Sequence, residues 1–299
     1  MTYSEIWHRI ATSYDDSEAR AIARILIEEL FGLSYADIVC GATEQLSADD
    51  TLRLDTAVRR IEQGEPLQHV LGYADFCGNR FCVNDSVLIP RPETEWLVDE
   101  SAKLMKGCIA SDETQHKAPH SPKRILDIGT GSGCIAISLK LRLGDAYVEA
   151  WDISEEALRT AQDNADALKA EVVFRKRDAL RADNTAAPWD LIVSNPPYIC
   201  DSERSAMDDN VLLHEPHTAL FVPDDDPLRF YRAIARYALL TLNIGGSLLF
   251  ECNTRYAEAT GKMLSDMGFE EVTVSDDCFN LPRFVRGSSP SQPSPSGRA

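Results

Sequence analysis

The sequence lacks the segments that carry a chain into or across a membrane. Its 299 residues contain no apolar run close to the about 20 residues that a transmembrane helix needs. The N-terminus reads Met1-Thr2-Tyr3-Ser4-Glu5, without the basic and apolar regions of a signal peptide, and it is too acidic for a transit peptide. We therefore expect a cytoplasmic protein with reduced thiols and no membrane partner.

Metal-binding patterns are also missing. The eight cysteines form no Cys-x-x-Cys pair, so the sequence offers neither a zinc ribbon nor a dithiol redox motif. His116 and His120 lie in the polar segment 107–123, but no further ligands accompany them. No metal site is expected.

The chain has little positive charge. Its formal net charge is −18, whereas a protein that binds nucleic acid through phosphates gathers Lys and Arg, so no direct nucleic-acid partner is expected. Residues 1–75 contain no lysine and carry 14 acidic against 6 basic residues, a net charge of −8. This surface is either simply solvated or a docking module for a basic partner.

Residues 1–72 have the pattern of a small helical domain. Three segments have the form of an N-terminal capping box or its Asp variant: Thr2-x-x-Glu5, Ser34-x-x-Asp37 and Ser47-x-x-Asp50. In residues 73–90 the helical pattern ends, and Phe76 and Phe81 flank a Gly78-Asn79 turn. This pattern predicts a β-hairpin linker between two domains.

From Arg124 onward, strand-like and helical patterns alternate, which predicts a doubly wound α/β sheet. The expected strands are Arg124–Ile128, Tyr147–Trp151, Glu171–Arg175, Leu191–Ser194, Ser247–Glu251 and Glu271–Val274. The expected helices between them are Cys134–Leu143, Ser154–Leu168, Leu228–Leu242 and Tyr256–Met267. The second domain is placed at 91–286, with a surface loop at 107–123 and a disordered Ser/Pro-rich tail at 287–299.

The first expected strand runs into the turn Asp127-Ile128-Gly129-Thr130-Gly131-Ser132-Gly133. Glycines at alternate positions allow a tight turn and a close approach to a ligand. Nucleotide-like ligands lie at such strand ends in open α/β sheets. The spacing differs from the dinucleotide fingerprint G-x-G-x-x-G, and no P-loop lysine follows. Asp127 suits a cationic ammonium better than a phosphate.

Two further acids end the next expected strands. Asp152 lies about 20 residues after the glycines, where an acid accepts hydrogen bonds from ribose hydroxyls. Asp178, followed by Ala179, could accept from an adenine amino group. A ligand with adenine, ribose and a cationic amino acid but no phosphate is S-adenosylmethionine, which we predict as the cofactor. The predicted cofactor residues are Asp127, Gly129, Thr130, Gly131, Ser132, Gly133, Asp152, Asp178, Ala179 and Asn195.

The strand Leu191–Ser194 ends at Asn195-Pro196-Pro197-Tyr198. Each proline fixes its φ near about −65° and restricts the residue before it. Such a rigid strand end presents a polar amide, bare carbonyls and an aromatic ring. It is either a polar turn or a surface that holds something flat, and the cofactor pocket upstream favours the second interpretation.

With these motifs the chain resembles the class I, Rossmann-like S-adenosylmethionine-dependent methyltransferases. Within them it is similar to the protein-(glutamine N5) methyltransferases of the PrmC/HemK family. The motifs more specific to that family are Gln68-His69-Val70-Leu71-Gly72, Ile89-Pro90-Arg91-Pro92-Glu93-Thr94-Glu95, Glu215-Pro216-x-x-Ala219-Leu220 and Arg283-Phe284-Val285. Ala179 departs from the pattern, because many relatives carry a larger residue there, often Trp.

The resemblance implies a seven-stranded sheet with helices on both faces, preceded by a helical domain that helps recognise the substrate. It also implies methylation of the glutamine in the Gly-Gly-Gln motif of class I peptide chain release factors. We expect the protein to be a monomer. Asn195 and Pro196 would each accept one N–H of the glutamine amide and Tyr198 would stack on it, so the substrate residues are Asn195, Pro196, Pro197 and Tyr198.

Two alternatives stay open. An adenine-N6 nucleic-acid methyltransferase shares the Asn-Pro-Pro-Tyr motif, and an inactive cofactor-binding adaptor could recruit a partner through the helical domain. The charge of −18 weighs against the first, and the intact motif at Asn195 weighs against the second.

Overall fold

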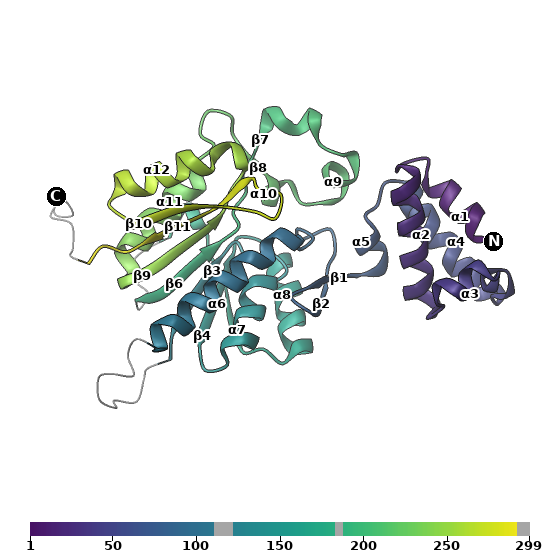
Figure 1. Ribbon diagram of the computed structural model, residues 1–299, viewed down its shortest axis with the longest axis horizontal. Helices are drawn as coiled ribbons and strands as arrows, with labels where there is room; N and C mark the ends of the chain where they lie inside the picture. The colour runs from purple at the N-terminus through teal and green to yellow at the C-terminus, as the bar shows by residue number, and fades with distance from the viewer. Residues whose placement is uncertain (111–121, 183–187, 292–299) are drawn as a thin grey trace.

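The computed structural model describes residues 1–110, 122–182 and 188–291. Its largest part is a seven-stranded sheet with the strand order β10-β11-β9-β6-β3-β4-β5 (Figure 1). The strands are β3 (Arg124–Ile128), β4 (Tyr147–Asp152), β5 (Val172–Lys176), β6 (Trp189–Ser194), β9 (Leu242–Glu251), β10 (Glu270–Asp276) and β11 (Pro282–Ser288). All are parallel except β11, which runs antiparallel to both neighbours. The predicted Rossmann-like fold class is confirmed.

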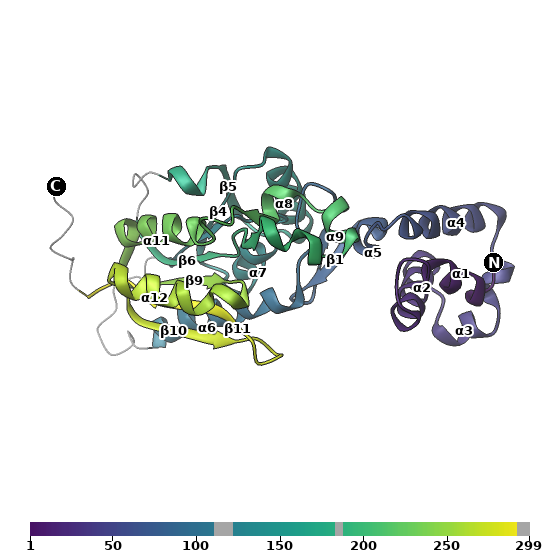
Figure 2. The ribbon, with the colours of Figure 1, turned by 90° about the horizontal axis from the view of Figure 1, so that it is seen from above.

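Both faces of this sheet are buried, as its continuous apolar strands require. Leu191 and Val193 pack into one core while Ile192, between them, packs into the other. Helices α6 (Glu95–Ala110), α7 (Cys134–Leu143) and α8 (Glu155–Leu168) cover the first face. Helices α11 (Arg229–Thr241) and α12 (Ala257–Met267) cover the second (Figure 2).

Strand β9 begins at Leu242, well before the predicted Ser247, and two bounds of the predicted irregular segments are also wrong. Helix α6 continues to Ala110, so Gly107 does not begin the expected loop; the rest of that loop, 111–121, lies outside the described residues. Strand β11 includes Gly287 and Ser288, so the tail does not begin at Gly287. Gly287 pairs with Leu248 of β9. A Cβ added to Gly287 would lie only 3.1 Å from Cβ of Phe269, so Gly287 is packed between β9 and Phe269. Residues 292–299 are outside the described range.

The chain between β6 and α11 contains elements that the sequence did not suggest. Strands β7 (Ile199–Cys200) and β8 (Phe221–Val222) form a separate parallel pair. Between them lie a 3-10 helix over Asp201–Ala206 and the short helices α9 (Asp209–His214) and α10 (His217–Leu220). These elements are too short to show a hydrophobic period.

The N-terminal helices have a hydrophobic core of their own and stand to one side of the sheet domain (Figures 1 and 2). They are α1 (Tyr3–Ile10), α2 (Asp16–Phe31), α3 (Tyr35–Val39), α4 (Ala48–Glu62) and α5 (Leu67–Leu71). The expected caps form: Thr2 and Ser34 each complete a capping box, and Oγ of Ser47 accepts from the amide of Asp50 at 3.1 Å.

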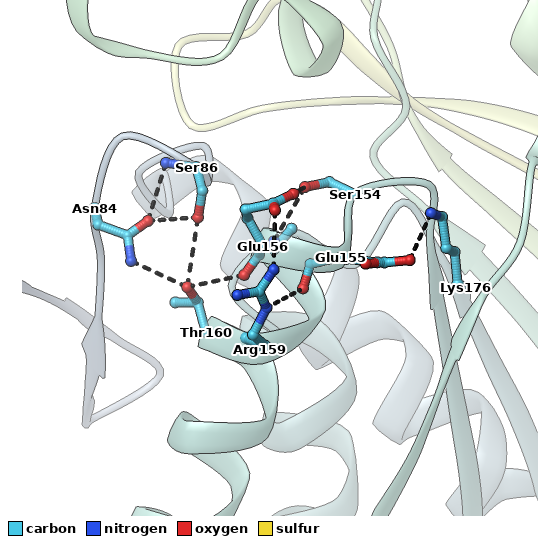
Figure 3. A network of polar contacts seen from close by, with 9 residues as sticks. Asn84, Ser86, Ser154, Glu155, Glu156, Arg159, Thr160 and Lys176 are labelled. Carbon is cyan, nitrogen blue, oxygen red and sulfur yellow. Dashed lines mark hydrogen bonds and ion pairs between the residues drawn. The ribbon is translucent and has the colours of Figure 1, made fainter.

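The linker forms the expected hairpin, β1 (Tyr73–Phe76) against β2 (Asn79–Cys82), and is fastened to α8. The Asn164 amide bonds both backbone polar groups of Cys82, accepting at 2.7 Å and donating at 3.0 Å. Further along, Nδ2 of Asn84 donates to Oγ1 of Thr160 at 3.0 Å (Figure 3). These bonds hold the next residues of the linker, from Ser86 to Leu88, against the mouth of the cavity described below.

Candidate active site

A cavity of about 340 Å³ opens at the carboxyl ends of the central strands. The chain starts the sheet at β3, adds β4 and β5 on one side, and then places β6 and β9 on the other. The cavity therefore lies where the strand order reverses, the usual ligand position in such sheets, and its volume is in the range of small-molecule sites. It brings together eight residues predicted from the sequence: Gly129, Gly131, Asp152, Asp178, Ala179, Asn195, Pro196 and Pro197.

The glycines of the turn after β3 divide into two roles. Gly129 and Gly131 have φ of +78° and +54°, and an added Cβ at either would point into open space beside the cavity. At Gly133 a Cβ would lie 3.1 Å from Cβ of Ala161 and 2.9 Å from Ile137, so this glycine allows α7 and α8 to pack closely. Gly133 does not line the cavity, and its predicted role in cofactor binding stays a prediction.

Asp152 at the end of β4 connects the glycine turn with the next helix. Its Oδ2 accepts from the amide of Gly131 and its Oδ1 from the amide of Ser154, both at 2.9 Å. Burial raises the pKa of this carboxyl, and the two backbone hydrogen bonds oppose the rise. Each oxygen keeps a further lone pair, so the side chain can still accept hydrogen bonds from hydroxyls of a ligand in the cavity.

Asp127 does not reach the cavity wall. Its side chain is fully buried, and its Oδ2 accepts from the hydroxyl of Thr130 at 2.7 Å. Burial raises the pKa of Asp127 to about 7, with Asp152 adding to the rise. The other oxygen, Oδ1, is buried without a hydrogen-bond partner among the described residues, and the expected contact with a ligand ammonium stays a prediction. Asp127 and Thr130 brace the turn from beneath, and Ser132 is buried behind it.

Another part of the cavity wall contains two residues that the sequence predicted as site residues, Asp178 and Ala179, and two that it did not. Asp178 caps a 3-10 helix over Ala179–Arg181, and its Oδ1 accepts from the amide of Leu180 at 2.8 Å. Opposite the small side chain of Ala179, Phe230 and Ile234 of α11 line the same cavity. These two residues were missed, because a helix 50 residues downstream gives no local sign that it packs there.

The residues after β6 form a further part of the cavity wall. Pro196 and Pro197 line it, and Oγ of Ser194 fixes the strand end by donating to the carbonyl of Ile128 at 2.6 Å. Tyr198 does not line the cavity; its hydroxyl donates to Oε1 of Glu251 at 3.3 Å. Stacking of this ring on a substrate amide stays a prediction.

Two buried residues behind Asn195 were missed from the sequence. Thr94 is 3% exposed and Glu251, the last residue of β9, is 1% exposed. Nδ2 of Asn195 lies 3.4 Å from Oγ1 of Thr94, which in turn donates to Oε2 of Glu251 at 2.7 Å. Burial raises the pKa of Glu251, and the Thr94 bond opposes that. The parallel pairing of β6 with β9, Ser194 opposite Phe250, places these strand ends side by side.

Two family motifs far apart in the sequence meet beside the cavity. Nη2 of Arg91 lies 2.5 Å from Oε1 of Glu215, and Oε2 of Glu215 accepts from the amide of Ile89 at 3.3 Å. The Glu215 side chain is 4% exposed. Pro216, Thr218 and Ala219, which follow it, line the cavity.

No group of three His, Cys, Asp or Glu side chains in the described parts of the chain is arranged to hold a metal ion. Within the same parts, none of the helices combines the length and the apolar character needed to span a bilayer.

Models of two protein families match the chain. The one described as methyltransferase small domain matches residues 98–220, and the one described as PrmC N-terminal domain matches residues 6–72.

Relatives match over almost the whole length. The release factor glutamine methyltransferase of Bacteroides thetaiotaomicron is 43% identical over 273 residues, covering 91% of this chain and 93% of that protein. The protein of the same name from Flavobacterium psychrophilum is 36% identical over 281 residues, covering 93% and 94%. Among solved structures, the hMettl16 catalytic domain in complex with MAT2A 3'UTR hairpin 6 matches with a TM-score of 0.52 at 17% identity, covering 83% of this chain and 84% of that one. That last likeness is one of fold.

Proposed function

The chain belongs to the family of release factor glutamine methyltransferases, and we propose that it methylates the side-chain nitrogen (N5) of a release-factor glutamine. The glutamine is that of the Gly-Gly-Gln motif of class I peptide chain release factors, and S-adenosylmethionine is the methyl donor. The observation that supports the proposal is that Asn195 and Pro196 line the same cavity as Gly129, Gly131 and Asp152.

Three features of the cavity support this donor. Gly129 and Gly131 leave open space where a ligand must approach the backbone closely. Asp152 retains acceptor capacity for a ribose diol, and Asp178 and Ala179 line the same cavity, where we assign them to the adenine base. Asp152 and Asp178 suit a nucleoside with a sulfonium, although Arg177 and Arg229 line the same cavity. When bound, the cofactor supplies an electrophilic methyl group and leaves as S-adenosylhomocysteine.

The residues after β6 act on the glutamine. Its amide nitrogen is a poor nucleophile, because the lone pair is delocalised into the carbonyl. Oδ1 of Asn195 and the carbonyl oxygen of Pro196 each accept one N–H, which aims the lone pair at the methyl group and favours loss of resonance. Positioning of this kind contributes roughly 7–11 kcal/mol in well-oriented systems.

The bond from nitrogen to methyl carbon forms as the bond from sulfur to that carbon breaks, and the surplus amide proton then passes to water or a carbonyl. Tyr198 is assigned to the flat face of the amide and Pro197 to the floor beneath it. The transfer needs no metal, because a sulfonium is already an activated leaving group.

The N-terminal helices present the acidic surface on which the release factor docks. The protein is proposed to act as a cytoplasmic monomer, where translation takes place, and without binding nucleic acid directly. The formal net charge of −18 supports a protein rather than a polyanion as the partner.

A labelled-methyl experiment tests the function. The protein is incubated with tritiated S-adenosylmethionine and a class I release factor, the same factor with its Gly-Gly-Gln glutamine changed to alanine, or duplex DNA. We expect label only on the unchanged release factor. Label on DNA would support the adenine-N6 alternative, and cofactor binding without any transfer would support the adaptor.

A further inference from the structure

The side-chain amide of Asn195 could present either its oxygen or its nitrogen to a substrate, and the two choices have opposite consequences. An oxygen accepts the N–H of a glutamine amide, whereas an NH₂ group would repel it. Nothing in the Asn-Pro-Pro-Tyr motif itself selects between them. The selection must come from whatever contacts the other end of the Asn195 amide.

That contact is the hydroxyl of Thr94. A threonine hydroxyl has one proton, and here it is donated to Oε2 of Glu251 at 2.7 Å. Toward Asn195 the same oxygen therefore presents only lone pairs, and Nδ2 of Asn195 lies 3.4 Å away as the matching donor. Both Thr94 and Glu251 are at most 3% exposed, so water does not offer them other partners.

Glu251 accepts a second hydrogen bond, because the hydroxyl of Tyr198 donates to its Oε1 at 3.3 Å. Burial raises the pKa of Glu251 and Glu93 adds to the rise, whereas the bonds from Thr94 and Tyr198 and the charge of Arg283 favour the charged form. With both oxygens receiving hydroxyl protons, Glu251 has no proton to give to Thr94. Because Glu251 can only accept, Thr94 must donate to Glu251, and Asn195 must in turn donate to Thr94.

We propose that Thr94 and Glu251 are positioning residues that fix the Asn195 amide with its oxygen toward the methyl-accepting nitrogen. This rests on the proposed function, since it assigns an orientation to the group that holds the glutamine. Neither residue contacts the substrate. Their removal should affect the rate of transfer rather than the binding of either substrate.

The test compares Thr94→Val with Thr94→Ser, using release-factor methylation and calorimetric binding of S-adenosylhomocysteine. Valine keeps the shape and removes the hydroxyl, so we expect kcat to fall about 100-fold, as for small misplacements of a reacting group. The KM for the release factor and the affinity for S-adenosylhomocysteine should stay unchanged. Serine restores the hydroxyl and should restore kcat.

Glu251→Met provides a second variant if the valine variant does not fold. Methionine offers no strong acceptor for the Thr94 proton, which is then free to bond Oδ1 of Asn195 and turn the amide around, so kcat should again fall. A folded variant of either kind with the wild-type kcat would overturn the proposal, as would a loss confined to KM. Wild-type protein that fails to methylate the glutamine at all would contradict the proposed function instead, so the two failures are distinguishable.

Discussion

Arg91 and Glu215 lie 124 residues apart in the chain and form an ion pair of 2.5 Å beside the cavity. Glu215 is 4% exposed, whereas the side chain of Arg91 is 35% exposed. The carboxylate is therefore the buried partner of the ion pair, and the guanidinium is partly solvated. Because Glu215 also accepts from the amide of Ile89, it joins the linker to the segment that leads into α10. The pair therefore fixes one wall of the cavity relative to the other.

Removing the arginine should cost more than neutralising the acid. Arg91→Met leaves a buried carboxylate without its partner, and we expect a loss of about 2 kcal/mol in the free energy of unfolding, since Arg91 is partly solvated. Glu215→Gln keeps an oxygen for Ile89 and carries no charge, so it should cost less. Urea denaturation of both variants measures this. Equal losses would show that the buried charge is not what the arginine compensates.

Most of the sheet could be predicted from the sequence, because long apolar strands alternate with amphipathic helices. The expected strand Arg124–Ile128 and helix Cys134–Leu143 match their observed bounds. Strand β11 was not predicted, because Arg283 and Arg286 interrupt its apolar run. In the structure Arg283 pairs with Asp277 and Arg286 with Glu100. The short elements between β6 and α11 escaped it because they are held by tertiary contacts such as that of Glu215.

The candidate site divides in the same way. Residues on strand ends, such as Asp152 and Asn195, follow directly from the alternation of elements. The burial of Asp127 did not follow from the sequence, because a sequence shows that an acid ends a strand but not which side of the turn it faces. Thr94 and Phe230 could not be found at all, since each reaches the site from an element distant in the sequence.

Asn195→Ala should remove methyl transfer while leaving the cofactor site largely intact. The variant loses the oxygen that accepts one N–H of the glutamine, and we expect kcat to fall by about 10²–10³, as for loss of one catalytic hydrogen-bonding group. Transfer of tritiated methyl groups measures kcat, and calorimetry with S-adenosylhomocysteine provides the control. Turnover equal to that of the wild type would remove Asn195 from the reaction.

Asp152→Ala should instead weaken cofactor binding. The substitution removes the acceptor for the ribose and also the bond to the amide of Gly131, so the turn loses its tether. Asp152→Asn is the matched variant, since it keeps one oxygen and the side-chain size. We expect S-adenosylhomocysteine affinity to fall at least about tenfold, or about 1.4 kcal/mol, in the alanine variant and less in the asparagine variant. Unchanged calorimetric affinity in both would exclude the residue from the cofactor site.

Asp127 should make the folded protein less stable as the pH rises. Its pKa is about 7 in the folded chain and about 4 when unfolded, so the folded state binds more protons across that interval. The free energy of unfolding therefore decreases between about pH 4 and pH 7, by on the order of 4 kcal/mol from this group, and levels off above.

Asp127→Asn removes that titration and still offers an oxygen to Thr130. Urea denaturation at several pH values should show a variant that gains stability relative to the wild type as the pH increases; parallel curves would contradict the assignment. Glu251, another buried acid, titrates in both proteins and cancels in the comparison, whereas Asp152 interacts with Asp127 and is part of the difference. If the variant also kept its cofactor affinity, direct pairing of Asp127 with the ligand ammonium would be excluded.

The acidic N-terminal helices should speed association with a basic surface of the release factor. Asp16 and Glu44 are exposed there, in a region with a net charge of −8 over residues 1–75. Raising the salt from about 0.1 M to about 1 M shortens the Debye length from about 10 Å to about 3 Å, so the association rate measured by stopped flow should fall. Combining Asp16→Asn with Glu44→Gln should flatten this dependence. Asp266→Asn on α12, an equally exposed change in the sheet domain, should leave it unaltered, and an association rate that ignores salt would show that the acidic surface is merely solvated.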